Sequence, residues 1–104
     1  PGPIFTKAKD SAPAKYTVDA NVNNALVAND CIIGGRIKNS IIFRGVKVGR
    51  GAQIYNSVIL EKCVIEEDGE VSHAVLDKGV RVTRGKKVSG TWDAPQVIRK
   101  QEII

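Results

Sequence analysis

A repeat with a period of seventeen positions constrains the fold of this chain more than any other feature. "NSII" at residues 39–42 returns as "NSVI" at residues 56–59. When the chain is cut at this period from Ala20, it gives four similar rows: ANVNNALVANDCIIGGR, IKNSIIFRGVKVGRGAQ, IYNSVILEKCVIEEDGE and VSHAVLDKGVRVTRGKK. Neither an amphipathic helix nor a β-hairpin has such a period. The chain is therefore expected to stack one structural unit along an axis.

The rows share aliphatic residues at three positions. The first position reads Ala20, Ile37, Ile54 and Val71; the sixth reads Ala25, Ile42, Ile59 and Leu76; the twelfth reads Cys31, Val48, Ile65 and Val82. Two residues earlier the side chain is usually small, as at Ser40, Ser57, Ala74 and Ala52. Since inward side chains alternate along a strand, each row predicts three short strands joined by turns.

This pattern predicts an all-β fold, a triangular parallel β-helix of hexapeptide-type repeats with coils about 4.8 Å apart. About four coils are expected over residues 20–88. Residues 1–19 are expected to form an extended lead-in or interdomain linker, and residues 89–104 a C-terminal cap and strand. Trp92 is expected to act as a lid over the open end of the helix, with a ligand-stacking role as the alternative. An all-β sandwich with coincidental spacing is the alternative fold.

The charged residues predict ladders between coils, because the third row is acidic and its neighbours are basic. The expected stacks are Arg44–Glu61–Lys78, Arg50–Glu67–Arg84 and Glu70–Lys87. Opposite charges on neighbouring strands each contribute roughly 0.2–1 kcal/mol. Arg36 and Arg81 are expected to remain without an acidic partner, and they are therefore candidates for binding an anion.

No catalytic or metal-ligating set emerges from the residues. His73 is expected to point outward, and a hexapeptide-repeat acyltransferase would use such a histidine as general base. No loop interrupts the rows to build the cleft which that chemistry needs. A chain with one histidine also cannot supply the ligands of a three-histidine metal site. Cys31 and Cys63 are expected to be buried, unreactive thiols too far apart for a disulfide.

Composition excludes several other classes of function. The formal net charge is +5, but the five aromatic residues do not cluster among the basic ones, which argues against a nucleic-acid surface. No apolar run approaches the roughly 20 residues of a membrane helix. The polar, proline-containing start is unlike a signal peptide. These features favour a cytoplasmic protein that contacts neither nucleic acid nor membrane.

The residues also carry a resemblance to a known family. The stretch "VANDCIIGGRIKNSIIFRGVKVGRGAQIYNSVIL", followed by "AVLDKGVRV", resembles the C-terminal domain of glucose-1-phosphate adenylyltransferase. The segments "PIFTKAKDSAPAKY" and "DAPQVIRK" resemble those of the glycogen-biosynthesis regulatory-type subunits of Gram-positive bacteria. The resemblance implies a left-handed coil and a domain that carries regulation and oligomer contacts.

The family makes ADP-glucose and pyrophosphate from ATP and glucose 1-phosphate for glycogen synthesis. The resemblance implies that ATP and Mg²⁺ bind a separate catalytic domain whose nucleotide loop has no counterpart here. Lys78 in "LDK", and less closely Arg36, correspond to effector-binding positions; with Arg81 they form the expected sugar-phosphate effector site. The expected partner is a catalytic subunit of the same enzyme, in a homo- or hetero-oligomer. A hexapeptide-repeat acyltransferase domain and a scaffold without a small-molecule role are the alternatives.

Overall fold

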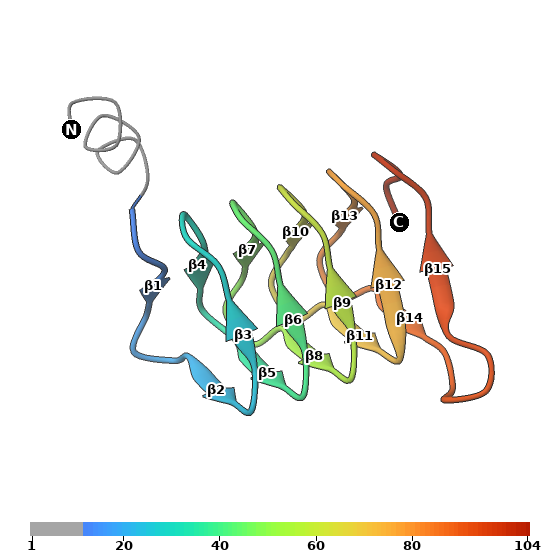
Figure 1. Cartoon of the computed structure of the whole chain (residues 1–104), viewed down its shortest axis with the longest axis horizontal. Coiled ribbons are helices and arrows are strands. Elements are labelled where there is room, and N and C mark those ends of the chain that lie inside the picture. Colours follow the sequence, from blue (N-terminus) through green and yellow to red (C-terminus); the bar gives the residue numbers. More distant parts are fainter. Residues whose placement is uncertain (1–11) are drawn as a thin grey trace, which may run out of the picture.

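Three parallel sheets enclose a narrow apolar interior in the computed structural model, which describes residues 12–104 (Figure 1). Sheet A contains β1 (Lys15–Tyr16), β4 (Ile32–Ile33), β7 (Lys47–Val48), β10 (Val64–Ile65) and β13 (Arg81–Val82). Sheet B contains β2 (Asn21–Asn23), β5 (Arg36–Lys38), β8 (Gln53–Tyr55), β11 (Glu70–Ser72) and β14 (Lys87–Ser89). Sheet C contains β3 (Leu26–Val27), β6 (Ile41–Ile42), β9 (Val58–Ile59), β12 (Ala74–Leu76) and β15 (Gln96–Ile98).

Each coil takes one strand from each sheet, so that coil 1 holds β1–β3 and coil 5 holds β13–β15. Every strand pairs in parallel with the equivalent strand of the next coil. In Figure 1 the chain passes from the rear sheet to the lower sheet and then to the front sheet as it advances from N to C, which is a left-handed winding. The predicted β-helix fold is confirmed. No helix among the described residues is long and apolar enough to cross a membrane.

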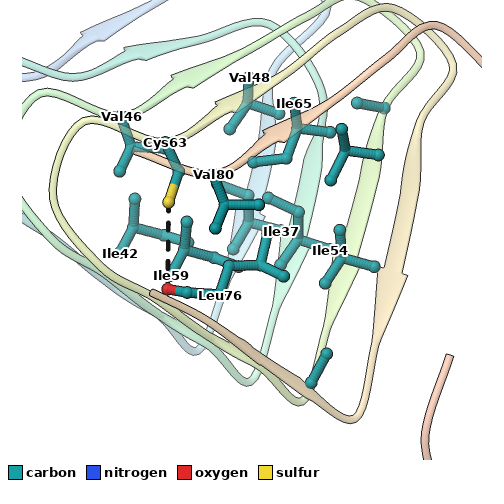
Figure 2. Close-up of a cluster of buried hydrophobic side chains, with 14 of the residues drawn as sticks. Ile37, Ile42, Val46, Val48, Ile54, Ile59, Cys63, Ile65, Leu76 and Val80 are labelled. Carbon is teal, nitrogen blue, oxygen red and sulfur yellow. Dashed lines mark hydrogen bonds between the residues drawn. The ribbon is translucent and has the colours of Figure 1, made fainter. Parts of the chain in front are cut away.

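The interior is built from the aliphatic columns of rows two to four. Ile37, Ile54 and Val71 stack from sheet B, and Ile42, Ile59 and Leu76 stack from sheet C, each of them at most 1% exposed. Figure 2 shows the columns pointing toward one another across the triangle. Each such side chain contributes about 1.5–3 kcal/mol by leaving water.

The first row is out of register with the other three, so its predicted inward residues do not stack on the predicted partners. Val22 lies opposite Ile37, and Val27 lies opposite Ile42, so these partners are two positions closer in sequence than the period predicts. Ala20 and Ala25 therefore occupy the small-residue positions of their columns, and Ile33 rather than Cys31 lies opposite Val48.

The two missing residues belong to the turn at Gly34–Gly35, between β4 and β5. A Cβ at Gly35 would lie 2.3 Å from the carbonyl oxygen of Ala52 and 2.9 Å from that of Gly49. The backbone thus turns close to the next coil, which is a position that only glycine can occupy. Identical glycines in a sequence do not reveal how many residues the turn uses.

A fifth coil extends beyond the four that the period predicts. Sheet C gains β15, in which Val97 lies opposite Val75, and these partners are five positions further apart in sequence than those of the regular coils. The extra residues lie in the segment 90–95, between β14 and β15. At the other end, β1 pairs with β4, so the regular pairing already includes residues 15–16 of the expected lead-in. The rest of the lead-in, residues 1–11, lies outside the described residues.

The C-terminal end of the coil is covered in part by Ile104 and not by Trp92, so the predicted lid is wrong. Ile103 pairs with Arg81 at the edge of sheet A, and Ile104 packs against the core. The hydroxyl of Thr83 donates to the carbonyl oxygen of Ile104 at 2.5 Å. Trp92 instead lies at the corner between sheets B and C and is 76% exposed.

Candidate functional site

The three predicted effector residues do not form one site. Lys78 lies in the turn after β12 and Arg81 begins β13, so both lie at the corner between sheets C and A near the C-terminal end. Arg36 begins β5 on sheet B, three coils before Arg81. Three coils correspond to about 14 Å of rise, and Arg36 also lies on a different sheet, so it is separated from the other two.

The three predicted effector residues also differ in whether they form ion pairs. Arg81 pairs with Glu66 of the preceding coil, so the expectation that Arg81 lacks an acidic partner is wrong. The expected pair of Lys87 with Glu70 is confirmed at 3.6 Å. Lys78 does not pair with Glu61 within residues 12–104, and Arg36 also lacks an acidic partner in that range.

Two arginines form ion pairs with aspartates of earlier coils instead of the predicted glutamates. Arg44 pairs with Asp30 at 3.3 Å, and Arg50 pairs with Asp19 at 3.2 Å. The backbone N–H of Ala12 donates to Asp30 at 2.8 Å, and this bond, with help from Arg44, holds the pKa of the carboxyl below its ordinary value. A carboxylate fixed in this way is a better partner than a free glutamate, because less side-chain entropy is lost.

A column of polar residues runs along the corner between sheets B and C. Asn24, Asn39, Asn56 and His73 occupy this position in successive coils, each with φ between 50° and 53°. Asparagine adopts this left-handed conformation at low cost, which explains its repetition at a sharp corner. The Asn24 amide donates to Asn39 Oδ1 at 2.6 Å, and the Asn56 amide lies 3.5 Å from His73 Nε2.

His73 is partly exposed, as predicted for an outward residue, and both of its ring nitrogens have partners within the chain. Nδ1 lies 2.9 Å from the Ser72 hydroxyl, and Nε2 faces Asn56. The ring also meets Trp92 edge to face, with ring centroids 4.6 Å apart. These contacts fix the orientations of both rings. The third position of rows two to four (Asn39, Asn56, His73) was a signal of this polar column in the sequence.

Three connected hollows lie along the same corner. The first, of about 420 Å³, is lined by Asn24, Asn39 and Ile41 among others. The second, of about 410 Å³, shares those three residues and adds Asn56, Val58 and Trp92. The third, of about 160 Å³, shares the latter three and reaches His73 and Pro95. Together they form one continuous groove, which sequence reasoning missed because Trp92 reaches it only through the longer fifth coil.

The two cysteines are buried free thiols, as predicted. Cys63 Sγ donates to the carbonyl oxygen of Asp77 at 3.0 Å and lies 3.9 Å from that of Leu76, the contact drawn in Figure 2. Burial raises the pKa of both thiols above the ordinary value. Residues 12–104 contain no cluster of three or more His, Cys, Asp or Glu side chains that could hold a metal ion.

The comparisons with known proteins agree with this geometry. The profile of the family described as "GlmU-like, C-terminal hexapeptide" matches residues 11–95, which is most of the chain. The chain belongs to this family. It has the stacked parallel coils expected of a hexapeptide repeat, with one constant spacing between paired residues from coil 3 to coil 4.

The chain is also similar to several curated proteins. The chain is 41% identical over 98 residues to "Glycogen biosynthesis protein GlgD" of Bacillus subtilis (strain 168), covering 94% of this chain and 29% of that protein. It is 36% identical over 89 residues to "Glucose-1-phosphate adenylyltransferase" of Novosphingobium aromaticivorans, covering 80% and 21% respectively. The enzyme of that name from Clostridium perfringens (strain SM101 / Type A) is 34% identical over 99 residues, covering 88% and 26%.

This chain therefore spans less than a third of the length of these relatives. The matched parts are their C-terminal regions, as the resemblance in the sequence indicated. The acyltransferase alternative is not favoured by these relatives.

Proposed function

We propose that this chain is the assembly and regulatory domain of a glucose-1-phosphate adenylyltransferase subunit, active in the cytoplasm in glycogen biosynthesis. The reaction joins ATP and glucose 1-phosphate to give ADP-glucose and pyrophosphate. In this proposal ATP and Mg²⁺ bind another domain, and this domain supplies contacts to the nucleotidyltransferase part of the enzyme.

The observation that supports assembly is the N-terminal end of the coil, where residues 12–104 leave the interior partly uncovered. Val22 and Val27 belong to the inward columns, yet they are only partly buried, whereas Ile37 and Ile42 one coil later are at most 1% exposed. At the C-terminal end Val88 and Ile98 are at most 6% exposed, and Ile104 packs against the core. An end that exposes interior side chains and unpaired strand edges is stabilised when another protein surface covers it.

The nucleotidyltransferase part of the enzyme is the proposed occupant of that end. More than two thirds of each matched relative lies outside the region similar to this chain. A catalytic subunit in a homo- or hetero-oligomer is the proposed partner. The β1–β3 edge offers backbone groups for pairing, and Val22 and Val27 offer apolar area.

Regulation by a sugar-phosphate effector is proposed at the corner that holds Lys78. Leu76 lies opposite Ile98, and the Gln101 N–H donates to the Lys78 carbonyl oxygen at 2.8 Å, so Lys78 and Lys100 occupy nearly equivalent places in successive coils. Two stacked ammonium groups repel one another until an anion lies between them. Arg81 lies on the same corner but is occupied by Glu66. Arg36 would belong to a separate anion site.

The assembly proposal is tested in the full-length subunit with Val22→Asp. We expect this variant to lose association with its catalytic partner in size-exclusion chromatography with light scattering. Val18→Asp is the matched control, because Val18 lies in the same coil but is almost fully exposed. A thermal melt of the 104-residue chain carrying Val22→Asp separates lost docking from lost folding. Unchanged association with the folded variant would refute the proposed docking end.

The regulatory proposal is tested by titrating glucose 6-phosphate and fructose 1,6-bisphosphate against the assembled enzyme. We expect Lys78→Ala with Lys100→Ala to shift the activation or inhibition midpoint by about tenfold or more, which corresponds to about 1.4 kcal/mol. Lys15→Ala, on the distant first coil, is the control. Coincident titration curves would remove Lys78 from the effector site.

A further inference from the structure

We propose that the groove between sheets B and C binds a linear, neutral oligosaccharide. The name corner groove is used here for the depression between two parallel columns, with Asn24, Asn39 and Asn56 on one side and Leu26, Ile41 and Val58 on the other. Trp92 stands at its C-terminal end. The groove begins in the first coil beside the docking end proposed above, and it lies on a different corner from Lys78.

The groove is uncharged along its whole length. None of the residues that line its three hollows is Asp, Glu, Lys or Arg, and His73 is their one titratable side chain. A fourth hollow, on sheet A, is lined by Lys47, Glu66, Glu67 and Arg84. In a chain with 26% charged residues, an uncharged strip that crosses several coils favours a neutral ligand over a phosphate ester or an acidic peptide.

The asparagine column offers both donors and acceptors to a ligand. Asn24 gives its amide hydrogen to Asn39 Oδ1, which leaves Asn24 Oδ1 and the Asn39 amide nitrogen without another side-chain hydrogen bond among residues 12–104. Asn56 directs its amide nitrogen to His73, and its Oδ1 makes no side-chain hydrogen bond among residues 12–104. Sugar hydroxyls both donate and accept, and so match such a mixed row. The coil spacing of about 4.8 Å is close to the length of one pyranose ring.

Trp92 is exposed, yet held in place. Its ring is fixed edge to face against His73, which leaves indole surface open to solvent. The Thr91 N–H donates to the Ala94 carbonyl oxygen at 3.1 Å, and the Ala94 N–H donates to Thr91 Oγ1 at 3.0 Å. A rigid exposed aromatic ring loses little entropy on binding and can cover the C–H face of a sugar ring.

The aliphatic column supplies the second apolar surface. Leu26, Ile41, Val58, Val75 and Val97 lie opposite one another in register on the outer face of sheet C. Leu26 is 69% exposed and Ile41 is 42% exposed. An ordered strip of exposed apolar side chains marks a binding surface. The amides on one side and the apolar strip on the other match the hydroxyl edge and C–H face of a glycan chain.

The test is isothermal titration calorimetry of the 104-residue chain with maltoheptaose and cellohexaose, which separate α- from β-linked glucans. We expect one of them to bind with a Kd below about 1 mM, and glucose to bind at least tenfold more weakly. The same ligand should shift the fluorescence of Trp92, the one tryptophan of the chain. A chain that binds neither oligosaccharide would overturn the proposal.

Two variants locate the site. Trp92→Ala should weaken binding tenfold or more, whereas Tyr16→Ala, which removes an exposed aromatic ring on sheet A, should leave binding unchanged. Asn39→Asp keeps the shape and the left-handed backbone but replaces the amide donor, and it should weaken binding several-fold with little change in Tm. Equal losses with Trp92→Ala and Tyr16→Ala, or binding that survives Trp92→Ala, would place the ligand elsewhere. Unchanged binding by Val58→Glu would also contradict a ligand in the groove. The apolar strip would then be a surface for a protein partner instead.

Discussion

The backbone N–H of Ser57 donates to Ser40 Oγ, 3.1 Å away and one coil earlier. Ser57 Oγ in turn accepts from the Ala74 N–H at 3.1 Å and donates to the Tyr55 carbonyl oxygen at 2.8 Å. Each of these two buried serine hydroxyls thus accepts a hydrogen bond from a backbone N–H of the next coil. Ser40 and Ser57, the small residues beside Ile42 and Ile59, therefore also satisfy backbone groups at this corner.

Ser57→Ala is expected to destabilise the fold by about 1–3 kcal/mol, because it leaves the Ala74 N–H without its partner in a buried position, while the Tyr55 carbonyl oxygen keeps the His73 N–H. Ser89→Ala is the control, since Ser89 is exposed on β14. Urea unfolding followed by circular dichroism measures both. Equal midpoints for the two variants would show that the serine column does not stabilise the corner.

Ile59→Asp is expected to prevent stable folding, with a loss above about 4 kcal/mol, because it places a charge in a fully buried aliphatic column. Glu61→Gln should change stability by less than about 0.5 kcal/mol, since Glu61 forms no ion pair within the described residues. Thermal melts rank the two variants, and the opposite order would contradict the inward assignment of Ile59.

Gly35→Ala is expected to cost about 1–3 kcal/mol or more, because its Cβ would overlap the Ala52 carbonyl oxygen in the shortened turn. Gly85→Ala tests conformational strain alone: Gly85 has φ of +72°, and nothing lies within 4 Å of an added Cβ. That variant should cost about 1 kcal/mol. A Gly85 variant less stable than the Gly35 variant would argue against close contact between the coils at Gly35.

Cys31 and Cys63 should react slowly with a disulfide reagent in the folded chain and quickly in denaturant. Burial raises both pKa values, so the folded chain keeps the neutral thiols that the unfolded chain begins to lose at alkaline pH. Stability from these thiols is therefore complete below the ordinary thiol pKa and falls as the pH rises through the raised value. Fast modification of either thiol under native conditions, or stability that rises over this range, would contradict their burial.

The 104-residue chain by itself is expected to form no ADP-glucose from ATP, glucose 1-phosphate and Mg²⁺. The reason is the proposed division of labour, in which the nucleotide and the metal bind another domain. A coupled pyrophosphate assay measures the reaction, with an intact glucose-1-phosphate adenylyltransferase as the positive control. Pyrophosphate release by the purified chain above the enzyme-free rate would refute this division.

The sequence by itself determined the coil, its three sheets and the inward columns of rows two to four. The reason is physical: Ile37, Ile54 and Val71 repeat at a spacing that a straight parallel stack requires, and burial of each one depends on the next. It also determined the lack of a disulfide, since Cys31 and Cys63 fall two coils apart.

The tertiary structure alone decided the register at both ends of the coil. Gly34 and Gly35 cut two residues from one turn, and the segment 90–95 adds five to another. Such changes of turn length leave no mark in a residue pattern, because turns bury few side chains.

The partners of the surface charges were also decided in three dimensions. Arg44 reaches Asp30 in the preceding coil, and Arg50 reaches Asp19 two coils earlier, past the shortened turn at Gly34–Gly35. The corner groove depends in the same way on the longer fifth coil, which brings Trp92 back beside His73. Periodicity fixes what lies inside a β-helix, whereas the irregular turns decide what its surface can bind.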